Sequence, residues 1–183
     1  MAKIIGISGS ISAPSRTKAL VEEIVSRAAH KVHAGAEIID IAQIAPVLGA
    51  TLSYNQFPDS LRLVYEKLQQ ADLIVIASPV YKASYTGMLK HFFDLMDPKM
   101  LVGKVAILAA TGGSDQHASV LDYQLRTLAS FFGVYTVPTA IYAKDTEFDN
   151  YELTSDAVKQ RIDVAIDQAH FLLSQNPPQA LVA

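Results

Sequence analysis

The sequence predicts an open α/β fold in which helices cover both faces of a parallel sheet. Four apolar runs are dominated by consecutive Ile, Val, Leu and Ala residues instead of alternating with polar ones: residues 3–8, 36–41, 73–78 and 104–110. Unbroken runs of this kind are typical of strands that are buried on both faces. Segments with helical spacing separate them, so that strand and helix alternate five times. This alternation predicts a doubly wound sheet with right-handed crossovers.

The remaining elements follow from the same patterns. A fifth apolar run, residues 134–142, is interrupted by Pro138, which suits an edge strand or a bulge. Five parallel strands predict the order 2-1-3-4-5. Residues 43–58 are expected to be a long connection that forms a surface lobe or a partner contact. Helices are expected where apolar residues recur at helical spacing, at residues 17–32, 59–70, 86–96, 115–132 and 154–173.

Length and composition limit the classes of protein to consider. Half of the 183 residues are hydrophobic, and we expect a single domain over residues 1–173 followed by a loose tail at residues 174–183. The net charge of −3 and the lack of a basic block argue against a nucleic-acid partner. The chain has no cysteine, which excludes disulfides, thiolate nucleophiles and zinc–thiolate sites. Because it shows neither a signal-peptide pattern nor a membrane-spanning apolar run, we expect a cytoplasmic protein with no membrane partner.

The first predicted strand leads into a loop that suits an anion. Residues 8–17 combine one glycine, several hydroxyl side chains and Arg16, immediately before a helix N-terminus. Hydroxyls, a guanidinium and the free N–H groups of a helix start are all donors to a phosphate. The same residue types also make ordinary helix caps and turns, so this loop alone leaves both interpretations open. It contains neither a P-loop nor a G-x-G-x-x-G motif.

Two further loops are expected to meet this one at the same edge of the sheet. In open α/β sheets, ligands bind beyond the carboxyl ends of the strands, where the strand order reverses. Residues 78–87 follow the third strand and would offer an apolar, proline-stiffened surface to a flat ring, with the backbone N–H groups of Tyr81 and Lys82 as donors. Residues 111–117 follow the fourth strand, and two glycines there let backbone approach a ligand. Each loop alone is also consistent with a plain turn, but the coincidence of all three favours a binding site.

Several motifs in these loops form a recognisable set. The most specific block is Ser78-Pro79-Val80-Tyr81-Lys82-Ala83-Ser84-Tyr85-Thr86-Gly87-Met88-Leu89-Lys90, followed by Phe93-Asp94-Leu95. Gly9-Ser10, Pro14-Ser15-Arg16, Ala110-Thr111-Gly112-Gly113 and His117 with Asp122-Tyr123 accompany it. Together these motifs resemble the NAD(P)H-dependent FMN reductase family, which has a flavodoxin-like fold, and above all the branch that supplies reduced flavin to alkanesulfonate monooxygenases. The resemblance covers roughly residues 3–170.

The resemblance implies roles for the residues at matching positions. The first loop would hold the FMN phosphate, and the other two would line the isoalloxazine ring. The residues implied in cofactor binding are Ser8, Ser10, Ser15, Arg16, Thr17, Pro79, Val80, Tyr81, Lys82, Ser84, Thr111, Gly112, Gly113 and Ser114. Tyr123 would contact the flavin or a neighbouring subunit, or else pack in the core, and His117 would lie near the flavin or cap a helix. Many relatives have an arginine where this chain has Ile11, so Arg16 would supply the charge alone.

The activity implied by the resemblance is hydride transfer from NADPH or NADH to FMN. Such a transfer needs no side-chain acid or base, so no catalytic residue is expected, and no histidine pair in these loops has the spacing of a metal site. Lys82 and Arg126 are candidates for reading the ribose phosphate of NADPH. The resemblance further implies a homodimer or homotetramer and a partner flavin-dependent monooxygenase. Two alternatives stay open: an FMN-containing quinone, azo-dye or chromate reductase, and a non-enzymatic flavodoxin-like electron carrier, which the small net charge disfavours.

Overall fold

A parallel sheet of six strands forms the centre of the molecule. The computed structural model describes residues 2–175 and places the strands in the order β2-β1-β3-β4-β5, with β6 also paired to β4. This order and the parallel pairing confirm the predicted fold class. The strands are β1 Lys3–Ser8, β2 Gly35–Asp40, β3 Leu73–Pro79, β4 Val105–Gly112, β5 Tyr135–Thr136 and β6 Ile141–Lys144.

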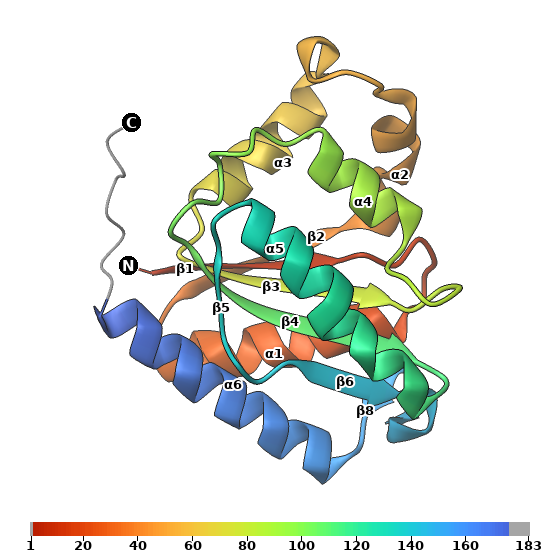
Figure 1. Ribbon diagram of the computed structural model, residues 1–183, viewed down its shortest axis with the longest axis vertical. Coiled ribbons are helices and arrows are strands. Elements are labelled where there is room, and N and C mark those ends of the chain that lie inside the picture. The colour runs from red at the N-terminus through yellow and green to blue at the C-terminus, as the bar shows by residue number, and fades with distance from the viewer. Residues whose placement is uncertain (1, 176–183) are drawn as a thin grey trace.

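Helices cover both faces of the sheet (Figure 1). One apolar cluster joins α1 and α6 to one face, and a second joins α3, α4 and α5 to the other. The helices are α1 Arg16–Val32, α2 Ile41–Ala50, α3 Asp59–Gln69, α4 Gly87–Asp94, α5 Arg126–Phe131 and α6 Asp156–Gln175. Shorter elements are the 3-10 turns η1 Tyr54–Gln56, η2 Asp115–Ser119 and η4 Asp145–Glu147, the π-helix η3 Leu121–Leu125, and the hairpin strands β7 Phe148–Asp149 and β8 Glu152–Leu153. Within residues 2–175, no helix combines the length and the apolar character needed to cross a membrane.

The predicted helical stripes become the core. In α1 every apolar residue of the stripe is buried, from Leu20 to Ala28. On the other face, Tyr65 of α3 is stacked between Phe57 and Phe92, with ring centroids 5.0 Å and 4.7 Å away. Burial of this apolar surface is the main favourable contribution to folding.

The fifth predicted strand is divided. β5 pairs with the start of β4, and β6 pairs with its end, from Ala109 to Gly112. Pro138 lies between the two pieces and has no N–H to give to a ladder. Both pieces therefore occupy one edge of β4, and the chain after β6 reaches the same end of the sheet as the chain after β4.

Two expectations about the connections are corrected. Residues 43–58 are not one long connection, because α2 extends to Ala50 and leaves only the segment containing η1 without an α-helix. The side chain of Asp40 caps α2 by accepting a hydrogen bond from the Ala42 N–H at 3.2 Å, and Pro46 is accommodated inside the helix. The predicted helix 115–132 is also not uniform, since it passes from 3-10 through π to α geometry. Of the predicted tail, Ser174 and Gln175 belong to α6, and the rest lies outside the described residues.

Candidate active site

The loops after β1, β3 and β4 meet at one cleft of about 280 Å³. Four of the residues implied in cofactor binding, Ser8, Lys82, Ser84 and Ser114, are not part of its lining. The cleft is lined by Ser10, Ser12, Pro14, Ser15, Arg16, Thr17, Pro79, Val80, Tyr81, Thr111, Gly112, Gly113, Asp145 and Tyr151. The structure thus brings together the greater part of the predicted set from three distant segments.

Hydrogen bonds of the Gly9 backbone fasten the first loop to β3 and to the second loop. The Gly9 N–H donates to the Ala77 carbonyl at 2.7 Å, and Thr86 Oγ1 donates to the Gly9 carbonyl at 2.7 Å. A Cβ atom at position 9 would lie 2.8 Å from the Ala77 oxygen. Only glycine permits this close approach of the two chains, which sets the starting direction of the loop.

The lining of the cleft is rich in hydroxyl groups. Ser15 is the N-cap of α1, and its Oγ accepts from the Lys18 N–H at 3.2 Å, so the helix-cap interpretation of this residue holds. Thr17 Oγ1 lies 2.7 Å from Thr111 Oγ1, and both threonines are buried. Because α1 begins at Arg16, the unpaired N–H groups and the positive dipole end of the helix also lie at the cleft.

A tight turn shapes the second loop. Tyr81 and Ser84 exchange backbone hydrogen bonds of 2.9 Å and 3.1 Å, while Lys82 and Ala83 between them have φ values of 51° and 63°. The Tyr81 N–H, predicted to be free for a ring atom, is therefore used inside the turn. Gln124 supports the turn from η3, since Ser84 Oγ donates to Gln124 Oε1 at 2.5 Å and Gln124 Nε2 donates to the Ala83 carbonyl at 2.8 Å.

The third loop closes over a partly buried tyrosine. Tyr142 Oη donates to the Ser114 carbonyl at 2.6 Å, and a Cβ atom at Gly112 would lie only 2.6 Å from that oxygen. Burial raises the pKa of Tyr142, and nearby carboxylates, Asp145 among them, add to the rise, so the phenol stays protonated and donates. His117 Nδ1 is buried beside the same glycine and has no hydrogen-bond partner within the described structure.

Two residues of the cleft, Asp145 and Tyr151, lie outside the three loops that were predicted to form it. Asp145 Oδ1 lies 3.5 Å from Arg16 Nη1, and the Arg16 guanidinium lies 5.5 Å from the centroid of the Tyr151 ring. Both residues follow β6, which the topological argument did not include among the site-forming strands. The signal that could have found them is the pairing of the last strand with β4, which brings its carboxyl end to the same edge.

The other predicted residues have different surroundings. Ser8 is fully buried below the cleft, and its Oγ has no partner in the described part of the chain. Tyr123 is 81% exposed, so it does not pack in the core. The Arg126 guanidinium bonds to Asp122, Thr136 and Val137, so the donors of this candidate NADPH reader are already engaged within the fold. Lys82 is exposed at the tip of the turn.

The chemistry of the cleft fits FMN. Its lining offers hydroxyl donors, a guanidinium and a helix N-terminus to a phosphate. It also offers the apolar surface of Pro79, Val80 and Tyr81 to a ring. Within residues 2–175, no three His, Cys, Asp or Glu side chains gather as a metal site would require.

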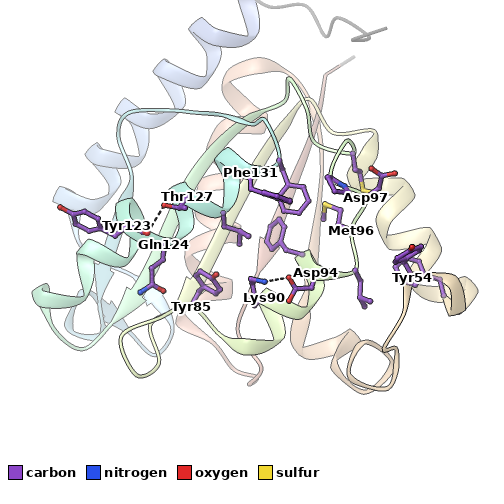
Figure 2. A pocket seen from close by; sticks show the side chains of 17 residues that line it. Tyr54, Tyr85, Lys90, Asp94, Met96, Asp97, Tyr123, Gln124, Thr127 and Phe131 are labelled. Carbon is purple, nitrogen blue, oxygen red and sulfur yellow. Dashed lines mark hydrogen bonds and ion pairs between the residues drawn. The ribbon is translucent and has the colours of Figure 1, made fainter. Parts of the chain in front are cut away.

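A larger hollow of about 970 Å³ lies on the face formed by α3, α4 and α5 (Figure 2). Its lining is mainly aromatic and aliphatic, from Tyr54 and Phe57 to Phe131 and Phe132. We call it the α4–α5 groove. It has few of the donors that a phosphate needs, so its size does not make it the better candidate for a nucleotide site.

Comparison with known proteins agrees with the composition of the cleft. The profile of the family described as NADPH-dependent FMN reductase matches residues 2–149. The chain is 43% identical to an FMN reductase (NADPH) of Pseudomonas aeruginosa, over 91% of this chain and 90% of that one. It is 41% identical to the NADH-dependent FMN reductase SfnF of Pseudomonas fluorescens, over 91% and 89% of the two chains.

A solved structure extends the agreement to the fold. The apo form of an NADH:FMN oxidoreductase, EMOB, superposes with a TM-score of 0.83 at 32% identity, covering 95% of this chain and 90% of the other. The family profile covers the three loops that line the cleft, and the relatives match nearly their whole lengths. The chain belongs to the NADPH-dependent FMN reductase family.

Proposed function

We propose that the chain transfers hydride from NADPH or NADH to FMN that binds reversibly in the cleft between the loops after β1, β3 and β4. The observation that carries this proposal is the composition of the cleft lining. It combines hydroxyl groups, Arg16 and the start of α1 with the apolar surface of Pro79, Val80 and Tyr81. Such a lining matches a ligand that has both a phosphate and a flat ring.

The chain contributes binding and orientation to this reaction. FMN when bound supplies the redox chemistry, by accepting a hydride on its ring. Ser10, Arg16 and Thr17 would hold the phosphate, while the turn at Tyr81 and the loop at Gly112 would position the ring and exclude water from it. No side chain needs to act as an acid or a base.

Reduced FMN would leave the protein for a partner flavin-dependent monooxygenase in the cytoplasm. The resemblance of residues 78–90 to the branch that supplies such monooxygenases supports this assignment. The openness of Arg16 to solvent, with 42% of its side chain exposed, also suits a phosphate that exchanges. A tightly bound prosthetic flavin would instead suit a quinone, azo-dye or chromate reductase.

We further propose that the α4–α5 groove is covered by a second copy of the chain. Figure 2 shows Tyr123 and Phe131 at this face, and these side chains are 81% and 69% exposed. Large exposed apolar surface of this kind marks contact sites. The turn that carries Tyr81 is joined to the groove through Gln124, so the subunit contact would lie beside the cleft.

The activity is tested with purified protein that has been passed through a desalting column. We expect oxidation of NADPH or NADH only after free FMN is added, with slower turnover for quinones and azo dyes. Measuring each nucleotide separately decides the preferred donor. If FMN stays on the protein in stoichiometric amount and quinones are reduced rapidly, the exchangeable-substrate proposal is wrong. If no flavin supports oxidation of either nucleotide, the whole assignment is wrong.

A further inference from the structure

Arg16 faces a carboxylate inside the cleft. Its Nη1 atom lies 3.5 Å from Asp145 Oδ1, with half of the Asp145 side chain exposed. Behind the guanidinium lies the Tyr151 ring, at a distance that permits a cation–π contact. In this arrangement the single arginine of the cleft already has an anionic partner.

The charges of the cleft lining balance to zero. Arg16 is its one cationic residue and Asp145 its one acidic residue. A phosphate monoester carries about −1.5 to −2 charges at neutral pH. It would therefore enter a cleft with no net positive charge, and it would meet the Asp145 carboxylate beside the arginine that should bind it.

The neighbouring lysine, Lys144, does not pair with the Asp145 carboxylate. Lys144 directs its ammonium group to Asp115 on η2, at 3.2 Å. Glu147 adds a further carboxylate to the same segment and bonds to the Lys144 N–H. Burial and, after it, these carboxylates raise the pKa of Tyr142, which lies under the third loop. Lys144 therefore leaves the Asp145 carboxylate to Arg16.

We propose that Asp145 determines how tightly the cleft holds a phosphorylated flavin, because its carboxylate competes with the phosphate for Arg16. This inference rests on the proposed function and deepens it. The competition lowers the affinity for FMN and speeds its release, as an enzyme that hands its flavin to a partner requires. Riboflavin has no phosphate, so Asp145 leaves its binding unchanged. If instead Asp145 served to orient Arg16 toward the phosphate, removal of the Asp145 carboxylate would weaken FMN binding.

The test compares the native chain with Asp145→Asn and, in case the amide disturbs the loop, with Asp145→Ala. Binding of FMN and of riboflavin is followed by flavin fluorescence, and FMN dissociation by stopped flow. Because an exposed ion pair contributes up to about 1 kcal/mol, we expect a Kd for FMN about two- to fivefold lower in both variants. The rate of FMN dissociation falls by the same factor as the Kd, and the Kd for riboflavin does not change. The difference in the Kd for FMN between the native chain and the variants becomes smaller in high salt.

Asp163→Asn is the matched control. Asp163 also pairs with an arginine, Arg27, at 3.0 Å, but on the face of α1 and α6. The Asp163→Asn substitution changes the net charge by the same amount as Asp145→Asn and should leave the Kd for FMN as in the native chain. An unchanged or higher Kd for FMN in the Asp145 variants overturns the inference, as does an equal gain for riboflavin. Native protein that binds no FMN at all overturns the proposed function together with the inference.

Discussion

Arg16 is the residue on which the phosphate end of the cleft depends. Ile11 leaves the first loop without a second cation, and Lys144 is paired elsewhere. A hydrogen bond to a charged group contributes about 1.5–3 kcal/mol. At the scale of single residues, this makes Arg16 the most sensitive position of the proposed site.

Replacing Arg16 by alanine should raise the Kd for FMN by about tenfold or more, since every 1.4 kcal/mol is a factor of ten. Riboflavin should bind nearly as well as before, because it lacks the phosphate. Calorimetric titration with both flavins measures the effect. Arg27→Ala serves as the control, because Arg27 lies on the α6 side of α1. An equal loss for both flavins would show that Arg16 supports the loop instead of the phosphate.

Much of the cleft could be predicted residue by residue, because the topological rule assigns loops to one edge of the sheet. Asp145 and Tyr151 could not, since only the loops after the first, third and fourth strands were assigned to the site, and both residues follow the last strand. The use of the Tyr81 N–H inside a turn was also hidden. That bond depends on positive φ values at Lys82 and Ala83, and neither residue is a usual sign of such a turn.

At the scale of elements, η3 supports the turn of the second loop. The Gln124 side chain forms hydrogen bonds with both the Ala83 carbonyl and the Ser84 hydroxyl. Gln124→Ala removes these bonds without changing a cleft-lining residue. We expect faster hydrogen exchange at residues 81–84 and a several-fold higher KM for FMN. Gln160→Ala is a control, because Gln160 is exposed on α6, on the other face of the sheet. Unaltered exchange in the Gln124 variant would show that the turn is held by its own backbone bonds.

Tyr65 makes the packing of α3 on α4 sensitive to alkaline pH. Its Oη donates to the Phe92 carbonyl at 2.7 Å, and burial raises the pKa of Tyr65 above its ordinary value. Above about pH 10 the unfolded chain loses this proton while the folded chain keeps it. The unfolded state then binds fewer protons, so the free energy of unfolding falls as the pH rises.

Urea unfolding at a series of pH values measures this decline. In Tyr65→Phe the decline should be shallower, and stability near neutral pH should be lower by about 1–3 kcal/mol, because the Phe92 carbonyl loses its donor. Part of the decline in stability with pH should remain in the Tyr65→Phe variant, because the pKa of Tyr142 is also raised in the folded chain. Identical slopes in the native chain and the variant would contradict the role given to Tyr65.

The prediction of elements was limited where local signals conflicted. Pro46 and Gly49, three residues apart, are typical of a connection, yet the Asp40 cap and the apolar contacts of Ile41 and Leu48 favour α2. In residues 115–132 the apolar spacing predicted a helix, but the π geometry of η3 inserts one residue per turn that periodicity alone does not reveal.

At the scale of the whole molecule, the exposed apolar face should decide the oligomeric state. Phe131 is 69% exposed at the α4–α5 groove, whereas Phe171 is 63% exposed on α6, on the other face of the sheet. We expect Phe131→Glu to shift the protein toward the monomer in light scattering, because it buries a charge in the contact. Phe171→Glu should leave the mass unchanged. A monomeric native chain, or the same mass for both variants, would contradict the subunit contact.

The layered arrangement followed from the unbroken apolar runs, because strands buried on both faces require helices above and below the sheet. The exposed face could not be predicted in the same way. Phe131 and Phe132 are adjacent and equally apolar, yet one is largely exposed and the other is buried. Helical periodicity places Phe132 but not Phe131 on the apolar stripe of residues 115–132, and it does not predict that so large an apolar side chain stays exposed.

The most direct test of the account is hydrogen exchange of the full chain with and without saturating FMN. The account predicts slower exchange in residues 9–17, 79–87 and 111–114, and little change along the α4–α5 groove. Protection confined to the groove, or no protection in the three loops at a concentration where FMN is bound, would contradict it.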